Sequence, residues 1–244
     1  MEWFQNSSFW ESTYPAMFPE ARFANASEEI AKILRLTSFR GGSILDLCCG
    51  PGRHSLALAP HGRVTGVDVT HFLLEKARAR AKEQGAPVEF VHGDMREFVR
   101  PATFDLAVNL FTSFGYFDTR EEDLRVLRNL HASLKPGGEL VIDVMGKEVL
   151  ARIFKSVVVD ELPDGALLVM WHEVVADWSR IRNRWIIQRV AERKEFTFEH
   201  NIYSAQELSD ALRAAGFSAV KIHGSYEGTP YDDKARRLIA VARR

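Results

Sequence analysis

Residues 44–54 read ILDLCCGPGRH, and this stretch decides how the chain is expected to fold. A short apolar run that includes Asp46 has the composition of a buried strand, and a loop with Gly50 and Gly52 follows it. Small residues let a backbone approach a ligand closely, and glycine adopts the φ values that a sharp strand-to-helix turn requires. Asp46, at the end of the strand, is placed to orient a ligand. The stretch therefore predicts a strand, a ligand-binding turn and a helix.

Strands and helices alternate on both sides of this turn. The expected strands are 43–47, 64–69, 88–91, 104–110 and 139–144, and the expected helices are one that begins after Ser27 as its N-cap, then 53–59, 71–84 and 121–134. Such alternation predicts a parallel sheet with helices on both faces. Residues 217–223 and 237–242 read as a terminal antiparallel hairpin. The expected fold class is α/β, with a doubly wound, mostly parallel seven-stranded sheet.

Two segments depart from this rhythm. Residues 153–203 contain four extended runs separated by turn residues, which predict an antiparallel β insertion that serves as a substrate cap or as the contact of a homodimer. Residues 1–26 are rich in aromatic side chains, and Trp10, Tyr14 and Phe18 share one face if the segment is helical. We expect an N-terminal helical lid there, with packing on the sheet as the alternative. The remaining parts, 27–152 and 204–244, form the core.

Composition and net charge argue against nucleic acid, membranes and metal ions as partners of this chain. The chain has 244 residues, of which 46% are hydrophobic and 27% charged, as in ordinary globular proteins. Its formal net charge of −1 removes the electrostatic attraction to nucleic acid or a membrane surface, so neither is an expected partner. Cys48 and Cys49 are adjacent and lack the spacing of zinc ligands, so we expect no metal site and reduced thiols in a cytoplasmic protein.

Four segments, in this order, resemble class I S-adenosylmethionine (SAM)-dependent methyltransferases. They are the 46–52 loop, Gly66-Val67-Asp68 at the end of the second strand, Gly93-Asp94-Met95 after the third, and the turn 134–140 that reads LKPGGEL. The resemblance covers roughly residues 30–145 and implies a Rossmann-like core with SAM as cofactor. The first glycine of the family's loop is Cys48 here, a modest tightening of the turn.

The resemblance also implies roles for single residues. Asp68 would accept both ribose hydroxyls, Asp94 would contact the adenine amino group, and Met95 would flank the adenine ring. The residues expected at the cofactor are Asp46, Cys48, Gly50, Gly52, Asp68, Val69, Asp94, Met95, Asn109, Phe111, Tyr14 and Arg22. Tyr116, Tyr14 and His54 are expected to act in catalysis as orienting groups, because no residue stands out as a general base.

The predicted function is methyl transfer to a small-molecule acceptor, an amine, carboxylate or hydroxyl, by in-line displacement with catalysis by positioning. The segment after Asn109 lacks the prolines of methyltransferases that act on DNA amino groups, and it resembles small-molecule enzymes, including the glycine and sarcosine N-methyltransferase group. One alternative is an NAD(P)-dependent oxidoreductase, because residues 50–55 lie one residue from the G-x-G-x-x-G fingerprint. Another is a SAM-binding protein without catalysis.

Two features of the insertion complete the sequence-based expectations. Arg180, Arg182 and Arg184 alternate onto one face, which favours a solvated surface over an anion-binding or dimer face. His172 and His200 are expected to be surface or packing histidines rather than catalysts.

Overall fold

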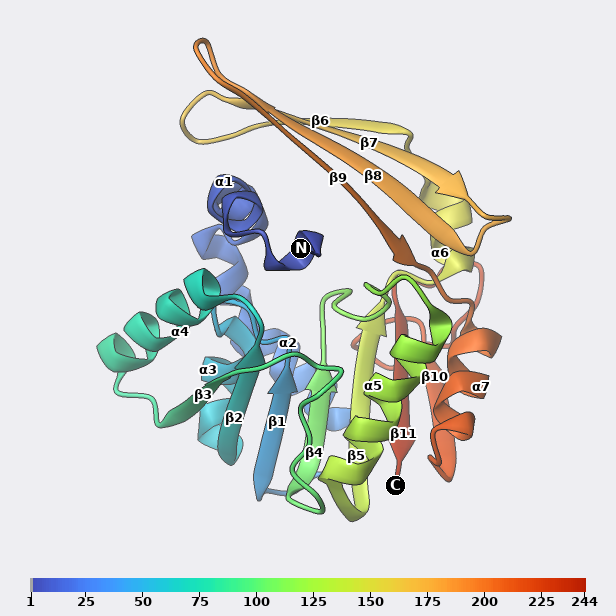
Figure 1. Cartoon of the computed structure of the whole chain (residues 1–244). Coiled ribbons are helices and arrows are strands. Elements are labelled where there is room, and N and C mark those ends of the chain that lie inside the picture. Colours follow the sequence, from blue (N-terminus) through green and yellow to red (C-terminus); the bar gives the residue numbers. More distant parts are fainter. Residues whose placement is uncertain (1) are drawn as a thin grey trace.

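A computed structural model of the protein describes residues 2–244 and contains two sheets (Figure 1). The larger has seven strands in the order β10-β11-β5-β4-β1-β2-β3. Its strands are β1 (Ser43–Leu47), β2 (Arg63–Asp68), β3 (Val88–His92), β4 (Phe104–Asn109), β5 (Leu134–Val144), β10 (Ala219–His223) and β11 (Leu238–Arg243). The first five are mutually parallel, and β11 runs antiparallel to both β5 and β10. The predicted α/β fold class is confirmed.

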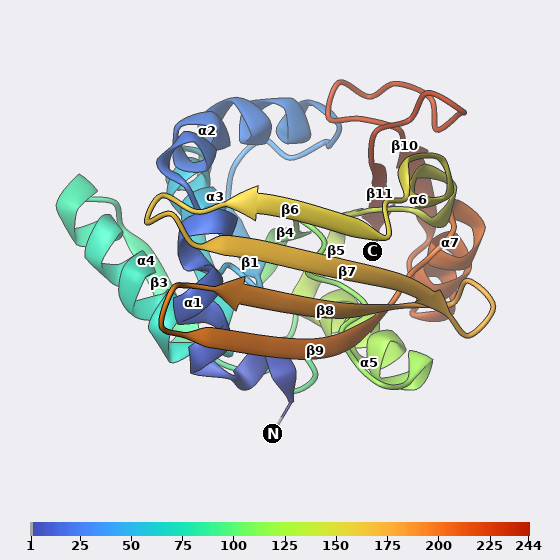
Figure 2. The same ribbon diagram turned by 90° about the horizontal axis from the view of Figure 1, so that it is seen from above.

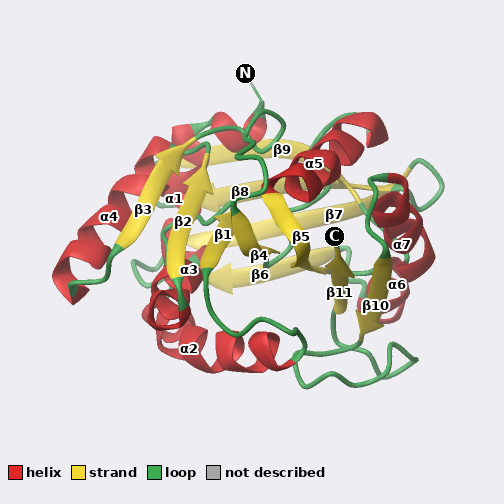
Figure 3. Ribbon diagram, turned by 90° about the horizontal axis from the view of Figure 1, so that it is seen from below, coloured by secondary structure: helices red, strands yellow, loops and turns green. Residues whose placement is uncertain are grey.

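Helices cover both faces of this sheet (Figure 3). They are α1 (Ser7–Met17), α2 (Glu20–Arg35), α3 (Arg53–Leu58), α4 (His71–Gln84), α5 (Arg120–Ser133), α6 (Lys147–Ile153) and α7 (Ala205–Ala214), with 3₁₀ turns η1 (Trp3–Gln5) and η2 (Ala59–His61). Ile30 of α2 and Leu58 of α3 belong to the apolar core on one face, and Val126 of α5 and Leu208 of α7 to the core on the other. None of the helices within residues 2–244 is both long and apolar enough to span a membrane.

Local capping signals explain where several helices begin. Thr119 and Glu122 form a reciprocal capping box at the start of α5, and Ser204 and Glu207 form a second one at the start of α7. The expected start of α2 at Ser27 is wrong. The helix begins at Glu20 after Pro19, so Ser27 lies inside it. Residues from Glu20 onward are helical without interruption. Proline at the position before the first helical residue is compatible with helix initiation.

The insertion forms a separate four-stranded antiparallel sheet, as predicted. Its strands are β6 (Val157–Glu161), β7 (Leu167–Val175), β8 (Arg180–Gln188) and β9 (Arg193–Asn201). Seen from above, this small sheet lies across the larger one (Figure 2). On its outer face Arg180, Arg182 and Arg184 pair with glutamates. Arg182 and Arg184 are exposed, as expected for a solvated surface, whereas the Arg180 side chain is mostly buried.

The N-terminal segment lies between the two sheets (Figure 1). Phe9 of α1 is buried and contacts Trp185, Phe196 and Phe198 on the inner face of the small sheet. Trp10 donates a hydrogen bond from Nε1 to the carbonyl of Phe4 at 2.7 Å, which fixes η1 against α1. The predicted N-terminal helix is therefore present and is held over the carboxyl ends of the parallel strands.

Candidate active site

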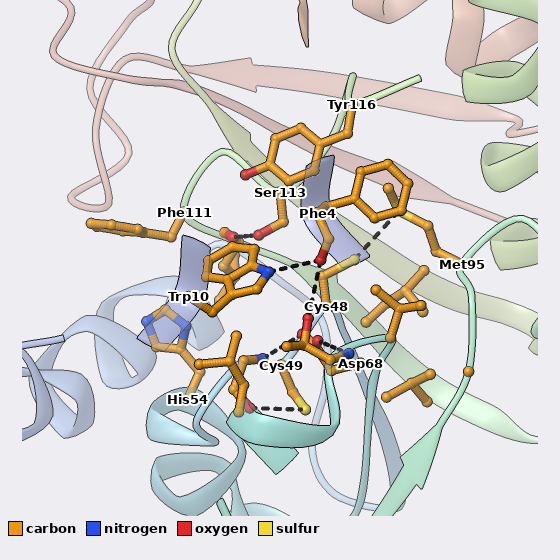
Figure 4. A pocket seen from close by; sticks show the side chains of 18 of the residues that line it. Phe4, Trp10, Cys48, Cys49, His54, Asp68, Met95, Phe111, Ser113 and Tyr116 are labelled. Carbon is orange, nitrogen blue, oxygen red and sulfur yellow. Dashed lines mark hydrogen bonds between the residues drawn. The ribbon is translucent and has the colours of Figure 1, made fainter. Parts of the chain in front are cut away.

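A pocket opens at the carboxyl ends of β1, β2 and β4, beneath η1 and α1 (Figure 4). Its volume is about 850 Å³, including the part open to solvent. The loops after the strands supply the floor and walls, and Phe4 and Trp10 of the N-terminal segment cover it. Ligands of open α/β sheets bind at this edge, beyond the carboxyl ends of the strands.

The loop after β1 brings its backbone to the pocket. Cys48 has φ 63°, a left-handed conformation that is rare for residues other than glycine, and Gly50 and Gly52 are left-handed as well. A Cβ on Gly52 would meet Ala77 and Phe90 at 3.0 Å, so this position also needs glycine for space. Burial raises the pKa of the Cys48 thiol well above its usual value, so the thiol is neutral and not a nucleophile.

Asp68 closes this loop from the end of β2. One of its carboxylate oxygens accepts from the backbone N–H of Gly50 and the other from that of Thr70, both at 2.8 Å. The side chain is buried, and burial raises the pKa of Asp68. Each oxygen retains a further lone pair, and the residue lines the pocket, so the carboxylate can also accept hydroxyl groups from a ligand.

Asp94 and Met95 form the pocket wall beyond β3. Asp94 accepts hydrogen bonds from the backbone N–H and the guanidinium of Arg96. Partial burial acts to raise the pKa of Asp94, but the bonds from Arg96 outweigh it and the pKa is lowered. Arg96 in turn pairs with Glu2 and Glu122, which ties this wall to the N-terminal segment and to α5.

The opposite end of the pocket is cationic. The guanidinium groups of Arg22 and Arg53 both lie close to the Phe111 ring, at 4.6 and 4.7 Å from its centroid. Arg53 is buried and donates from Nη1 to Glu29 at 2.6 Å, whereas its Nη2 is buried and has no hydrogen-bond partner among residues 2–244. A buried guanidinium N–H without a partner is costly. This end therefore suits a carboxylate.

Aromatic side chains line the rest of the pocket. Phe4, Trp10 and Phe18 come from the lid, and Phe111 and Tyr116 come from the segment after β4. Burial raises the pKa of Tyr116, so its hydroxyl stays protonated near neutral pH. Aromatic faces stabilise cations in a site shielded from water. The lining thus accommodates a positive ligand without an ion pair.

Nine of the residues predicted for the site meet around this pocket. They are Cys48, Gly50, His54, Asp68, Val69, Asp94, Met95, Phe111 and Tyr116. The sequence reasoning missed Phe4, Arg53 and Ser113, which also line it. Arg53 directly follows Gly52 of the glycine loop. Its place in the sequence could therefore have indicated that it lines the pocket. The roles assigned to all these residues remain predictions.

Asp46 and Asn109 lie beside the pocket rather than on its surface. The Asp46 carboxylate is buried and accepts from Ser55 Oγ at 2.6 Å, and burial raises its pKa. Asn109 donates from its amide to the carbonyl of Leu47 at 3.2 Å. Both side chains thus support the loop after β1 in this structure.

Tyr14, Arg22 and Gly52 are also outside the lining. Tyr14 packs edge-on against Phe72 of α4. Arg22 reaches Phe111 from behind, and partial burial lowers its pKa, as does the charge of Arg53. Their contact with a cofactor stays a prediction.

Two solved structures of methyltransferases share this fold. The CcbJ methyltransferase from Streptomyces caelestis aligns with a TM-score of 0.77 and 21% identity, over 90% of this chain and 94% of that one. SAM-bound CalS10 from Micromonospora echinaspora, an amino pentose methyltransferase involved in calicheamicin biosynthesis, aligns with a TM-score of 0.69 and 24% identity, over 97% and 96%. The chain thus has the same fold as these two methyltransferases.

Sequence comparisons also match methyltransferases. The family model of the methyltransferase domain matches residues 44–138. The chain is 28% identical over 207 residues to the cypemycin N-terminal methyltransferase of a Streptomyces species, covering 84% of each. It is 26% identical over 211 residues to the putative methyltransferase YqeM of Bacillus subtilis, covering 83% of this chain and 84% of that protein. The methyltransferase-domain match and these relatives support a SAM-dependent methyltransferase over the oxidoreductase alternative.

Proposed function

We propose that the protein transfers the methyl group of SAM to a small-molecule acceptor, an amine, carboxylate or hydroxyl, by in-line displacement. The observation that carries this proposal is the pocket itself. It has acceptor groups at one end, an unpartnered guanidinium N–H at the other, and aromatic walls between them. The structural neighbour CalS10, which acts on an amino pentose, supports a small acceptor.

The residues present fit SAM from end to end. Asp68 would accept the ribose hydroxyls, and Asp94 and Met95 would hold the adenine. The free Nη2 of Arg53, with Arg22 behind it, would bind the carboxylate of the methionine part. Phe111 and Tyr116 would then border the sulfonium. SAM supplies a methyl group on a positively charged sulfur, which is already activated for transfer.

Positioning is the contribution of the protein in this proposal. The lid residues Phe4 and Trp10 exclude water, and holding two reactants in line can supply roughly 7–11 kcal/mol of the barrier. Tyr116 and His54 orient the acceptor, since both line the pocket. Tyr14 supports the lid through its contacts with Phe18 and Phe72. A neutral amine needs no strong base before attack, which agrees with the protonated Tyr116.

In this proposal each segment of the chain has its own role. Residues 1–26 cover the cofactor, and residues 153–203 cap the acceptor. Residues 27–152 and 204–244 form the sheet and helices that hold the cofactor loops. Entry of either ligand then requires the lid to move, because Phe4 and Trp10 lie over the pocket.

The test is release of S-adenosylhomocysteine (SAH) from SAM across a panel of small amines, carboxylic acids and phenols. We expect one class to raise SAH above the acceptor-free background, and Tyr116→Phe to lower that rate. The exposed Glu83→Ala variant on α4 is the control. Absence of SAH with every class, in a protein that still binds SAM, would contradict the proposal.

A further inference from the structure

We propose that His172 and His200, on the inner face of the small sheet, bind the acceptor through one hydrogen-bond-accepting and one donating ring nitrogen, and so select a hydroxylated small molecule. This inference rests on the proposed function, because it names the acceptor class of the same site. Asn183 joins the two histidines and sets which nitrogen each one presents.

The three side chains occupy neighbouring strands. His172 of β7 is opposite Asn183 of β8, and His200 of β9 is opposite the nearby Ile181. Asn183 shares its face of β8 with Trp185, which contacts Phe9 of the lid helix. The cluster is therefore on the same face of the small sheet as the contacts with the N-terminal segment, and this sheet lies over the larger one (Figures 1 and 2).

Hydrogen bonds fix the orientation of the Asn183 amide. Its Nδ2 lies 3.4 Å from the carbonyl of Ile181 and 3.5 Å from that of Phe198, and both of these groups can only accept. The amide oxygen must then point to His172, whose Nδ1 is 2.8 Å away. The amide nitrogen lies 3.1 Å from Nδ1 of His200.

This orientation determines the tautomer of each ring. His172 donates from Nδ1, so in the neutral ring its Nε2 is an acceptor. His200 accepts at Nδ1, so its Nε2 carries the proton and is a donor. Burial, with the nearby His172 and Arg180, lowers the pKa of His200 to about 4, which keeps this ring neutral near pH 7. The cluster thus offers one acceptor and one donor.

Both Nε2 atoms are available. Within residues 2–244 neither has a hydrogen-bond partner, since the side-chain bonds of both histidines are made at Nδ1. Asn183 is 3% exposed, whereas both histidines are only partly buried. On the same inner face Phe198 stacks on Trp3 of η1 at 4.3 Å. The N-terminal segment thus covers the part of this face at Phe198.

The cluster also lies next to the segment that borders the cofactor pocket. Asn201, the residue after His200, donates from its backbone N–H to the carbonyl of Gly115 at 2.6 Å. Ser113 and Tyr116, on either side of Gly115, line the pocket. His200 is not part of the pocket lining, so the proposal requires an acceptor that extends from the pocket past the Gly115 segment to reach it.

A donor and an acceptor on the two sides of Asn183 match a ligand with several hydroxyl groups, because hydroxyls both donate and accept. A ligand without hydroxyls would leave two desolvated ring nitrogens without partners, and sites built to bind a hydroxyl reject such analogues strongly. We therefore expect hydroxylated probes to bind more than tenfold tighter than an apolar amine of similar size.

The experiment follows the histidine ring nitrogens by long-range ¹H–¹⁵N correlation in the full-length protein with SAH present. Glucosamine and methyl glucoside are the hydroxylated probes, and cyclohexylamine is the apolar probe. His172→Phe and His200→Phe assign the signals, and Arg184→Gln on the outer face is the control. Far-ultraviolet circular dichroism checks that each variant is folded.

We expect a proton on Nδ1 of His172 and on Nε2 of His200, and saturable shifts of both rings with the hydroxylated probes only. The opposite tautomers, or rings that do not respond to either hydroxylated probe, would overturn the proposal. Calorimetry with SAM on the same samples separates the two ideas. Loss of SAM binding contradicts the proposed function. Intact SAM binding, with histidine ring signals that do not shift with the hydroxylated probes, contradicts only the proposed acceptor class.

Discussion

Replacing Asp68 by alanine is expected to lower both the free energy of unfolding and the affinity for SAM, and the two effects can be measured separately. The change removes the acceptor of two backbone N–H groups, those of Gly50 and Thr70, at a buried position. An unsatisfied buried donor costs about 1–3 kcal/mol, so we expect roughly 2–6 kcal/mol of lost stability, less where water enters the space. Two lost ribose hydrogen bonds to a charged group, at about 1.5–3 kcal/mol each, correspond to a Kd raised roughly 10²–10⁴-fold.

Titration calorimetry with SAM measures the Kd, and urea unfolding measures the stability of the same preparation. Asp68→Asn keeps one carbonyl oxygen and the side-chain volume, so it should lose less stability than alanine while still binding SAM more than tenfold weaker. Glu83→Ala, an exposed acid on α4, should change neither quantity. A folded Asp68→Ala variant with the SAM affinity of the wild type would refute the reasoning.

Three further predictions concern the supports of the site. Cys48→Gly should bind SAM normally and keep its free energy of unfolding within about 1 kcal/mol of the wild type. Cys48→Val should lose more free energy of unfolding, because only glycine is unstrained at φ 63°. Urea unfolding measures both variants. Burial raises the pKa of Asp123 to about 6 from 3.8, so the folded state binds this proton more tightly. Relative to Asp123→Asn, the wild type should therefore lose on the order of 3 kcal/mol as the pH rises from about 4 to about 6, and a pH-independent difference would contradict this. Gly115→Ala would place a Cβ 2.5 Å from the carbonyl oxygen of Asn201 at φ 97°, so it should lower the melting temperature and weaken turnover together.

Much of the fold could be predicted because its signals are local. The capping box at Ser204 and Glu207 and the glycine turn after β1 each lie within a few residues of the element they define. Asp68 and Asp94 could be placed at one site because each follows a parallel strand, and the carboxyl ends of such strands meet at one edge.

The features that escaped prediction depend on partners far along the chain. The charge of Arg53 is matched by Glu29, which is 24 residues away on another helix, and only the folded structure shows that Nη2 stays free. Tyr14 lies on the predicted helix but packs towards α4, because tertiary contacts decide which side of a short helix faces the pocket. The start of α2 was missed because Ser27 has a good capping composition yet sits inside a longer helical run.

The most direct test of the account is titration calorimetry of the wild-type protein with SAM and, separately, with NADH. The pocket has the Asp68 carboxylate at one end, aromatic walls, and at the other end the Arg53 Nη2, which has no hydrogen-bond partner within residues 2–244. The proposed function therefore predicts SAM binding in the micromolar range and no heat with NADH. Binding of NADH without binding of SAM would contradict the account.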